Sequence, residues 1–138
     1  MSYFKKLSKN EIEKFIKNNQ HGILSMAGEK PYALPMGYMY KRKTFLLGLM
    51  ATGRKMKCLK KSKNICFTIC MPRWFTPKLK TPCTTLVIEG SLLEVTNRSY
   101  YGLKTPIPKT VQLFKIKAAK MGARKCNRKP CEVLAKKK

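Results

Sequence analysis

The sequence predicts a mainly β fold, a closed antiparallel barrel of six short strands with one N-terminal helix and a short helix after the third strand. Three observations lead to this prediction. Short apolar stretches alternate with turn residues along most of the chain, helical periodicity is confined to two short segments, and no internal repeat divides the 138 residues. A barrel is favoured because closure removes exposed strand edges.

The first predicted element is a helix that begins at Ser8. The Ser8 hydroxyl can cap the helix, and Glu11, three residues later, completes a capping box. Apolar residues then recur at helical spacing as far as Ile16, which indicates one apolar face. The only histidine, His21, lies near the end of this helix, and we interpret it as a helix-end or surface residue rather than a catalytic one.

Strand-like alternation and short apolar runs occupy six segments of the chain. They are residues 22–27, 31–40, 44–50, 64–70, 84–96 and 110–120. Between the third and the fourth, residues 53–62 contain no β-branched residue and suit a short helix. Gly90 interrupts an apolar run and predicts a bulge. Residues 119–138 are predicted to form a basic, partly irregular C-terminal tail.

The charge balance restricts the function without identifying it. Thirty-one Lys and Arg residues against six acidic ones give a formal net charge of +25, so the surface attracts anions of every kind. Lysine dominates and is spread along the chain, whereas specific nucleic-acid sites need Arg, Asn or aromatic groups placed against bases. Since the chain shows neither a signal peptide nor an apolar stretch of roughly 20 residues, we expect one cytoplasmic domain over residues 1–138 with no membrane partner.

The residues for common hydrolytic and metal chemistry are missing or badly spaced. The sequence contains no Asp, which excludes a Ser-His-Asp triad, and no Walker or Rossmann glycine motif. Cys66 and Cys70 share one face of a predicted strand, and we interpret both as packing residues. Cys126 and Cys131 are more widely separated than typical zinc hooks, and no second pair or histidine follows them. We expect reduced thiols and no metal site.

Three segments, in their order and spacing, resemble one known family. They are PYALPMGY at Pro31–Tyr38, LLGLMATGRKMKCLKKSKNICFTI at Leu46–Ile69 and TTLVIEG at Thr84–Gly90. From about Ser8 to Lys125 the chain resembles the pyridoxamine phosphate oxidase-related, FMN-binding split-barrel proteins, and most closely their nitroimidazole-reductase-like branch. The resemblance implies a split β-barrel with Greek-key-type connections and a homodimer that binds FMN at the subunit interface.

The resemblance also locates the expected phosphate site, and elementary electrostatics supports it. Arg54 and Lys55 stand at a turn that opens the predicted second helix, where free backbone N–H groups and the positive end of the helix dipole favour an anion. Arg54 can bind two phosphate oxygens at once, and Lys55 adds a point charge. Gly53 leaves room for the backbone to approach the anion, and Thr52 can donate a hydroxyl.

The flavin ring is expected to lie against two facing strands, because the family binds it there. The first strand offers Tyr32, Ala33, Leu34, Pro35 and Met36, and the second offers Gly48, Leu49, Met50 and Ala51. The resemblance further suggests Thr84 and Thr85 near the cofactor, and we nominate Trp74 and Phe75 as aromatic side chains that reach the partner subunit.

Two departures from the family limit the chemistry that the resemblance implies. Gly48 stands where the nitroimidazole-reductase-like branch often has His, and Met36 stands where the oxidase branch has Lys. We therefore assign no catalytic residue, and pyridoxamine phosphate oxidation is not expected.

The function predicted from the sequence is that of an FMN-dependent oxidoreductase. It passes electrons from a reduced nicotinamide, NAD(P)H, or another donor to a small-molecule acceptor, and the flavin supplies the redox chemistry. Two alternatives stay open: a non-catalytic flavin-binding or redox-sensing module, and a basic nucleic-acid-binding protein.

Overall fold

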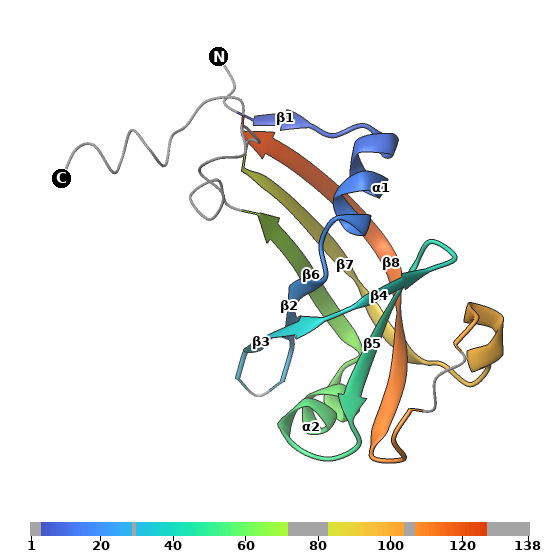
Figure 1. The fold of residues 1–138 in the computed structure, drawn as a ribbon. Coiled ribbons are helices and arrows are strands. Elements are labelled where there is room, and N and C mark those ends of the chain that lie inside the picture. Colours follow the sequence, from blue (N-terminus) through green and yellow to red (C-terminus); the bar gives the residue numbers. More distant parts are fainter. Residues whose placement is uncertain (1–3, 29, 72–82, 104–106, 127–138) are drawn as a thin grey trace.

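The fold is a single curled antiparallel sheet with two α-helices (Figure 1), seen in a computed structural model that describes residues 4–28, 30–71, 83–103 and 107–126. The strands are β1 (Phe4–Lys6), β2 (His21–Met26), β3 (Tyr32–Gly37), β4 (Met39–Lys41), β5 (Thr44–Met50), β6 (Asn64–Met71), β7 (Thr84–Glu94) and β8 (Val111–Cys126). The helices are α1 (Lys9–Lys17), α2 (Arg54–Lys61) and the short 3-10 helix η2 (Arg98–Tyr101).

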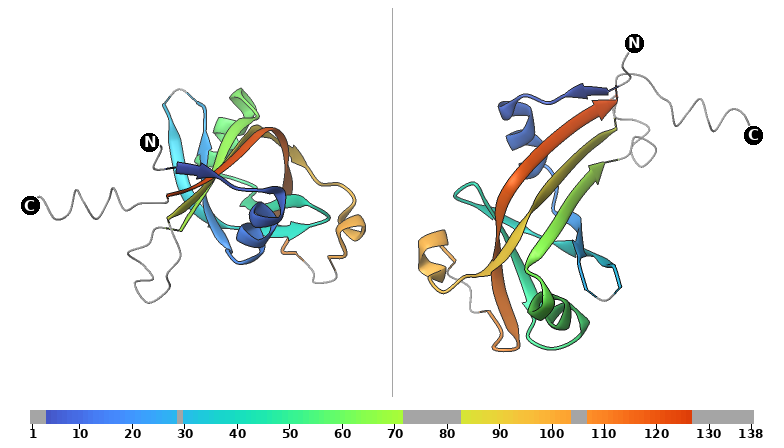
Figure 2. Two further views of the ribbon diagram at one scale, coloured as in Figure 1. Left: turned by 90° about the horizontal axis from the view of Figure 1, so that it is seen from above. Right: turned by 180° about the vertical axis from the view of Figure 1, so that it is seen from behind.

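The strand order confirms a mainly β, split-barrel architecture and corrects two details of the prediction. The sheet runs β3-β2-β6-β7-β8-β5-β4, and β1 pairs with β8. The strands wrap around a common interior (Figure 2), but among the described residues the end strands β3 and β4 do not pair with each other. The barrel is therefore open along one line, and the described residues form eight strands instead of the six predicted.

One of the additional strands arises because Tyr38 interrupts the second predicted strand. The Tyr38 backbone N–H donates to the carbonyl oxygen of Gln20 at 2.9 Å, and its hydroxyl donates to the carbonyl oxygen of Ile16 at 2.6 Å. These two bonds draw Tyr38 toward the end of α1 and divide the segment into β3 and β4. The other additional strand, β1, is only three residues long.

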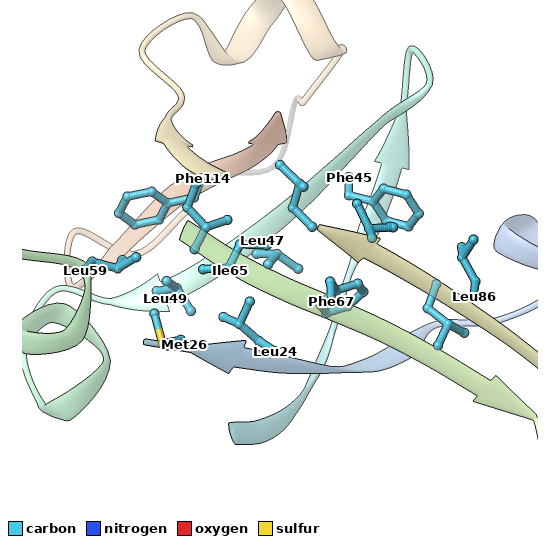
Figure 3. Close-up of a cluster of buried hydrophobic side chains, with 14 of the residues drawn as sticks. Leu24, Met26, Phe45, Leu47, Leu49, Leu59, Ile65, Phe67, Leu86 and Phe114 are labelled. Carbon is cyan, nitrogen blue, oxygen red and sulfur yellow. The ribbon is translucent and has the colours of Figure 1, made fainter. Parts of the chain in front are cut away.

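The interior is apolar because alternate residues of the strands face inward (Figure 3). Ile65, Phe67 and Ile69 of β6 are buried, as the alternation predicts, and Cys66 is half-buried on the opposite face. The prediction that Cys70 is a packing residue is wrong: its side chain is exposed and accepts a hydrogen bond from the Thr85 hydroxyl at 3.6 Å. It lies on the outer face of β6, opposite the face that carries the buried Ile69.

Helix α1 closes one end of the interior and has the predicted capping box. The Glu11 N–H donates to the Ser8 hydroxyl at 3.2 Å, and the Ser8 N–H donates to the Glu11 carboxylate at 3.1 Å. Ile16 is buried in the core. Helix α1 ends at Lys17 and His21 is the first residue of β2, where it is exposed, so His21 is the surface residue that the sequence predicted and not part of the helix end.

The longest strands, β7 and β8, carry the bulge that Gly90 predicts. Their register shifts between Glu89 and Gly90. The prediction of an irregular tail from residue 119 is wrong for residues 119–126, which continue β8 and pair with β7 as far as Lys125. Residues 127–138 lie outside the described part of the chain. Neither α1, with nine residues, nor α2, with eight, is long enough to span a membrane, and no other described helix is.

Candidate functional site

The barrel is open between β3 and the second half of β5, Leu47–Met50. We call this wedge-shaped opening the split. The two sides meet near Tyr38, because β4 follows β3 directly and pairs with β5 only as far as Leu46. In the described chain β3 pairs with β2 alone, so each side of the split presents one strand edge without a strand partner. Helix α2 follows β5 at the wide end (Figure 1).

The residues predicted to hold a ring divide between the two faces of these strands. Leu34 and Met36 pack against the core, and Leu49 is fully buried within it. Ala33 and Pro35 of β3 are exposed on the outer face. On β5, Gly48, Met50 and the following Ala51 are likewise exposed.

The outer face along the split is unusually apolar for an exposed surface. Ile23 is 46% exposed, Met39 38% and Met50 48%, and these are three of the large apolar side chains that the described surface leaves in contact with water. Ile23 lies directly opposite Pro35 in the β2–β3 pair. An apolar patch bordered by polar groups is typical of a binding surface.

The wide end of the split combines a cation with an open helix start. The guanidinium carbon of Arg54 lies 4.3 Å from the centre of the Tyr32 ring, a cation–π contact that joins the start of α2 to the start of β3. Gly53, the N-cap residue, has φ of 108° and no side-chain cap bond, and a Cβ placed on it would meet nothing within 4 Å. Thr52 is exposed beside it, and Lys55 is half-buried. The first N–H groups of α2 are therefore accessible to an anion.

A cavity of about 280 Å³ adjoins this helix start, and cations line it. Arg54, Lys57 and Lys61 project into it from α2, and Lys30 reaches it from the turn before β3. Sequence reasoning missed the three lysines. Positions 54, 57 and 61 have the spacing of one helical face, which could have indicated Lys57 and Lys61.

A second cavity, of about 420 Å³, lies at the narrow end of the split. Its lining includes His21 and the outward-facing Gly48, together with Gln20, Gly37, Tyr38, Met39 and Leu46. The sequence analysis did not associate His21 with this region, because the pairing of β2 with β3 that brings it opposite Gly37 is not encoded locally.

A larger cavity, of about 830 Å³, lies on the outer face of β2, β6, β7 and β8, around the bulge. Its lining holds one cation, Lys117, together with the exposed Glu89, and no helix start, so it lacks the combination of several cations and free N–H groups that favours an anionic ligand. We therefore place the candidate site at the split.

Two other predicted positions lie away from the split within one chain. Thr84 and Thr85 begin β7, where they pair with Met71 and Cys70, and they lie at the end of the sheet opposite α2 (Figure 1). Trp74 and Phe75 lie outside the described residues. Among the residues that the structure describes, no group of three or more His, Cys, Asp or Glu side chains could hold a metal ion.

Comparison with known proteins identifies the fold by structure and not by sequence. No protein-family model and no curated protein matches the chain. An FAD-binding protein (mll6688) from Mesorhizobium loti, 17% identical, superimposes with a TM-score of 0.70 over 91% of this chain and 99% of that one.

Two further solved structures extend this comparison. A candidate 5-nitroimidazole antibiotic resistance protein from Bacteroides thetaiotaomicron is 15% identical, with a TM-score of 0.66 over 89% of each chain. A candidate pyridoxamine 5'-phosphate oxidase from Corynebacterium glutamicum is 9% identical, with a TM-score of 0.66 over 92% of this chain and 96% of that one. The chain therefore has the split-barrel fold of the pyridoxamine 5'-phosphate oxidase-like proteins.

Proposed function

We propose that this protein binds FMN in the split and acts in the cytoplasm as a flavin-dependent oxidoreductase, passing electrons from NAD(P)H or another donor to a small acceptor. One observation carries the proposal: the accessible, cation-bearing start of α2 stands at the wide end of a split whose outer edges are apolar. A flavin nucleotide needs this combination, an anion site at one end and a flat apolar surface beside it.

The phosphate end fits the residues at the start of α2. A phosphate monoester carries close to two negative charges, which the N–H groups after Gly53 and the positive end of the helix dipole stabilise. The Arg54 guanidinium is held beside the split by the Tyr32 ring, so less conformational entropy is lost when it binds the phosphate. The uncapped Gly53 is consistent with this role, because a side-chain cap would compete with the anion for the same N–H groups.

The ring end fits the outer face of β3 and β5. Ala33, Pro35, Gly48 and Met50 present small or apolar surface to a flat ring, and the unpartnered strand edges can supply backbone hydrogen bonds to its polar rim. Leu34, Met36 and Leu49 support the strands from the core side and are not proposed to touch the cofactor.

A second copy of the chain is part of the proposal. The apolar surface around Ile23, Met39 and Met50 stays exposed in one chain, and pairing of two copies would cover it together with the ring. Thr84 and Thr85 could then approach the cofactor only from the partner, since within one chain they lie at the far end of the sheet. The names of the structural neighbours, FAD-binding among them, support a flavin as the ligand.

The proposal is tested first by the colour of the protein and then by a thermodynamic cycle. The absorbance spectrum of the purified, FMN-loaded and desalted protein should be that of bound flavin. Replacing Arg54 and Lys55 by Ala should weaken FMN binding by about 3 kcal/mol or more, roughly a 100-fold rise in Kd, because two charge-assisted contacts of about 1.5–3 kcal/mol each are lost.

Riboflavin, which lacks the phosphate, is the second ligand of the cycle: its Kd is compared with that of FMN in the wild type and in the variant. The wild type should prefer FMN to riboflavin, and the Arg54→Ala/Lys55→Ala variant should have lost most of that preference. The exposed lysines Lys60 and Lys63, which are not among the residues lining the 280 Å³ cavity, provide a charge-matched control whose replacement by Ala should leave the preference intact. Equal FMN preference in the two double variants would reject the phosphate assignment.

Turnover is tested separately from binding. Anaerobic addition of NADH or NADPH to the loaded protein should bleach the flavin absorbance. A flavin that binds tightly but is not bleached by either nucleotide would instead favour the non-catalytic flavin-binding or redox-sensing module.

A further inference from the structure

We propose that the 420 Å³ cavity at the narrow end of the split binds the electron acceptor, a small, uncharged, planar quinone-type carbonyl compound, and that His21 donates a proton to it. This inference rests on the proposed function, because it places the acceptor beside the flavin ring. Gly48 makes the connection: it belongs both to the outer edge of β5 proposed for the ring and to the lining of the cavity.

The His21 imidazole is held at the cavity by the pairing of β2 with β3. His21 lies directly opposite Gly37 in that pair. A Cβ built on Gly37 would stand 3.8 Å from His21 Cδ2 and 3.9 Å from Nε2. The ring therefore lies beside the glycine, and the missing side chain leaves open the space into which its nitrogen can donate.

The other residues that line the cavity carry no charge. Tyr38 is the only other titratable group among them. Its hydroxyl is engaged with the Ile16 carbonyl oxygen, and burial raises its pKa to about 12, so it stays neutral and is unsuited to proton transfer. Met39, which is exposed, gives the open cavity apolar surface, and Leu46 lies buried beneath it. Apolar surface beside one proton donor suits a flat, uncharged molecule with a carbonyl oxygen at its rim.

The chemistry of a quinone balances with one such donor. Reduction of a 1,4-quinone to the hydroquinone takes two electrons and two protons. A bound flavin, reduced by NAD(P)H, would supply a hydride equivalent, which accounts for both electrons and one proton. The N–H bond of the His21 imidazolium breaks to supply the other proton, a new O–H bond forms on the quinone, and the neutral imidazole is protonated again from water.

The chain has a single histidine, so the imidazole signals in the ¹⁵N NMR spectrum of the FMN-loaded protein report on His21 alone. The probe is tetramethyl-1,4-benzoquinone, whose substituted ring positions are blocked against addition of the cysteine thiols. Because the flavin is oxidised, the quinone can bind without reacting. Addition should shift the His21 signals in the wild type. Gly37→Ala, which the backbone tolerates, adds a methyl group beside the imidazole and should weaken that shift while FMN binding is retained.

The kinetic test follows reoxidation of the reduced protein by the same quinone in a stopped-flow instrument. His21→Gln should bind FMN as the wild type does and reoxidise about 100-fold more slowly. If the quinone leaves the His21 signals unmoved, or His21→Gln keeps the wild-type rate while flavin is bound, this inference is wrong. Failure of the wild type to bind FMN would instead overturn the proposed function.

Discussion

At the scale of single residues, Gly90 shows how one close approach determines the shape of the sheet. A Cβ at this position would stand 2.2 Å from the Lys117 carbonyl oxygen and 3.0 Å from Ala118 Cα, both backbone atoms that no rotamer change can move. Only glycine therefore allows β8, which carries the extra residue Ala119 at the bulge, to approach β7 this closely. The sequence predicted this bulge correctly, because a glycine inside an apolar strand segment has few other uses.

Gly90→Ala should destabilise the protein by about 3 kcal/mol, the upper part of the range for overpacking, because the backbone of β8 must move. Gly122 in β8 is the matched control: a Cβ there would meet nothing within 4 Å, so Gly122→Ala should be neutral or slightly stabilising. Urea unfolding followed by circular dichroism measures both. Equal midpoints for the two variants would contradict the close approach.

The residues of the candidate site could be predicted from the sequence only where neighbours in the chain are neighbours in space. Gly53, Arg54 and Lys55 form one local turn, so consecutive residues of the sequence were enough to predict their motif. Its role at the split stays a prediction. His21 reaches the site through the pairing of β2 with β3, and Lys30 reaches it from the turn before β3. No local pattern in the sequence reveals those contacts.

At the scale of elements, the alternation of apolar and polar residues located most strands correctly but predicted several strand ends wrongly. Strand β8 extends beyond its apolar run because basic residues can occupy its exposed face while Ala123 packs inward, so its polarity resembles that of a tail. β1 is too short to show any alternation. The division at Tyr38 depends on bonds to Gln20 and Ile16, which the alternation of the segment itself does not encode.

Helix α1 is fastened to the sheet by an ion pair as well as by its apolar face. Lys125 Nζ in β8 donates to the Glu11 carboxylate at 2.7 Å. This bond, and after it the bond from the Ser8 N–H, lowers the pKa of Glu11 from 4.5 to about 2. The ion pair thus links the first turn of the helix to the end of the longest strand.

Because the pKa of Glu11 is lower in the folded state, its contribution to stability is present above about pH 4.5 and is lost as the pH falls toward 2. Glu11→Gln retains a capping side chain and removes the charge. It should lower the Tm at neutral pH, and the Tm difference from wild type should close between pH 4.5 and 2. Lys125→Gln should behave alike, and the double variant should lose less than the sum of the two. A Tm difference that persists at pH 2 would show that Glu11 acts through packing.

At the scale of the whole molecule, the net charge of +25 is spread too widely to specify a ligand. It attracts polyanions whatever the function, so salt-sensitive adsorption to nucleic acid is expected even of a protein that binds a flavin. The split is more selective, because there a few cations coincide with an open helix start and an apolar surface. Selectivity comes from that coincidence and not from the total charge.

The same charge should make the protein more stable as salt is added. With six acidic residues against 31 basic ones, most cations have no carboxylate to pair with. Added salt therefore removes more repulsion between cations than attraction within ion pairs. The Debye length falls from about 10 Å at 0.1 M salt to about 3 Å at 1 M. The Tm measured by circular dichroism without flavin should therefore rise over this range of NaCl.

The Tm of the Arg54→Ala/Lys55→Ala variant should rise in parallel, since removing two of 31 cations changes the general field little. A rise confined to the wild type would mean that chloride binds at the start of α2. A fall in both proteins would mean that ion pairs such as Glu11–Lys125 outweigh the repulsion.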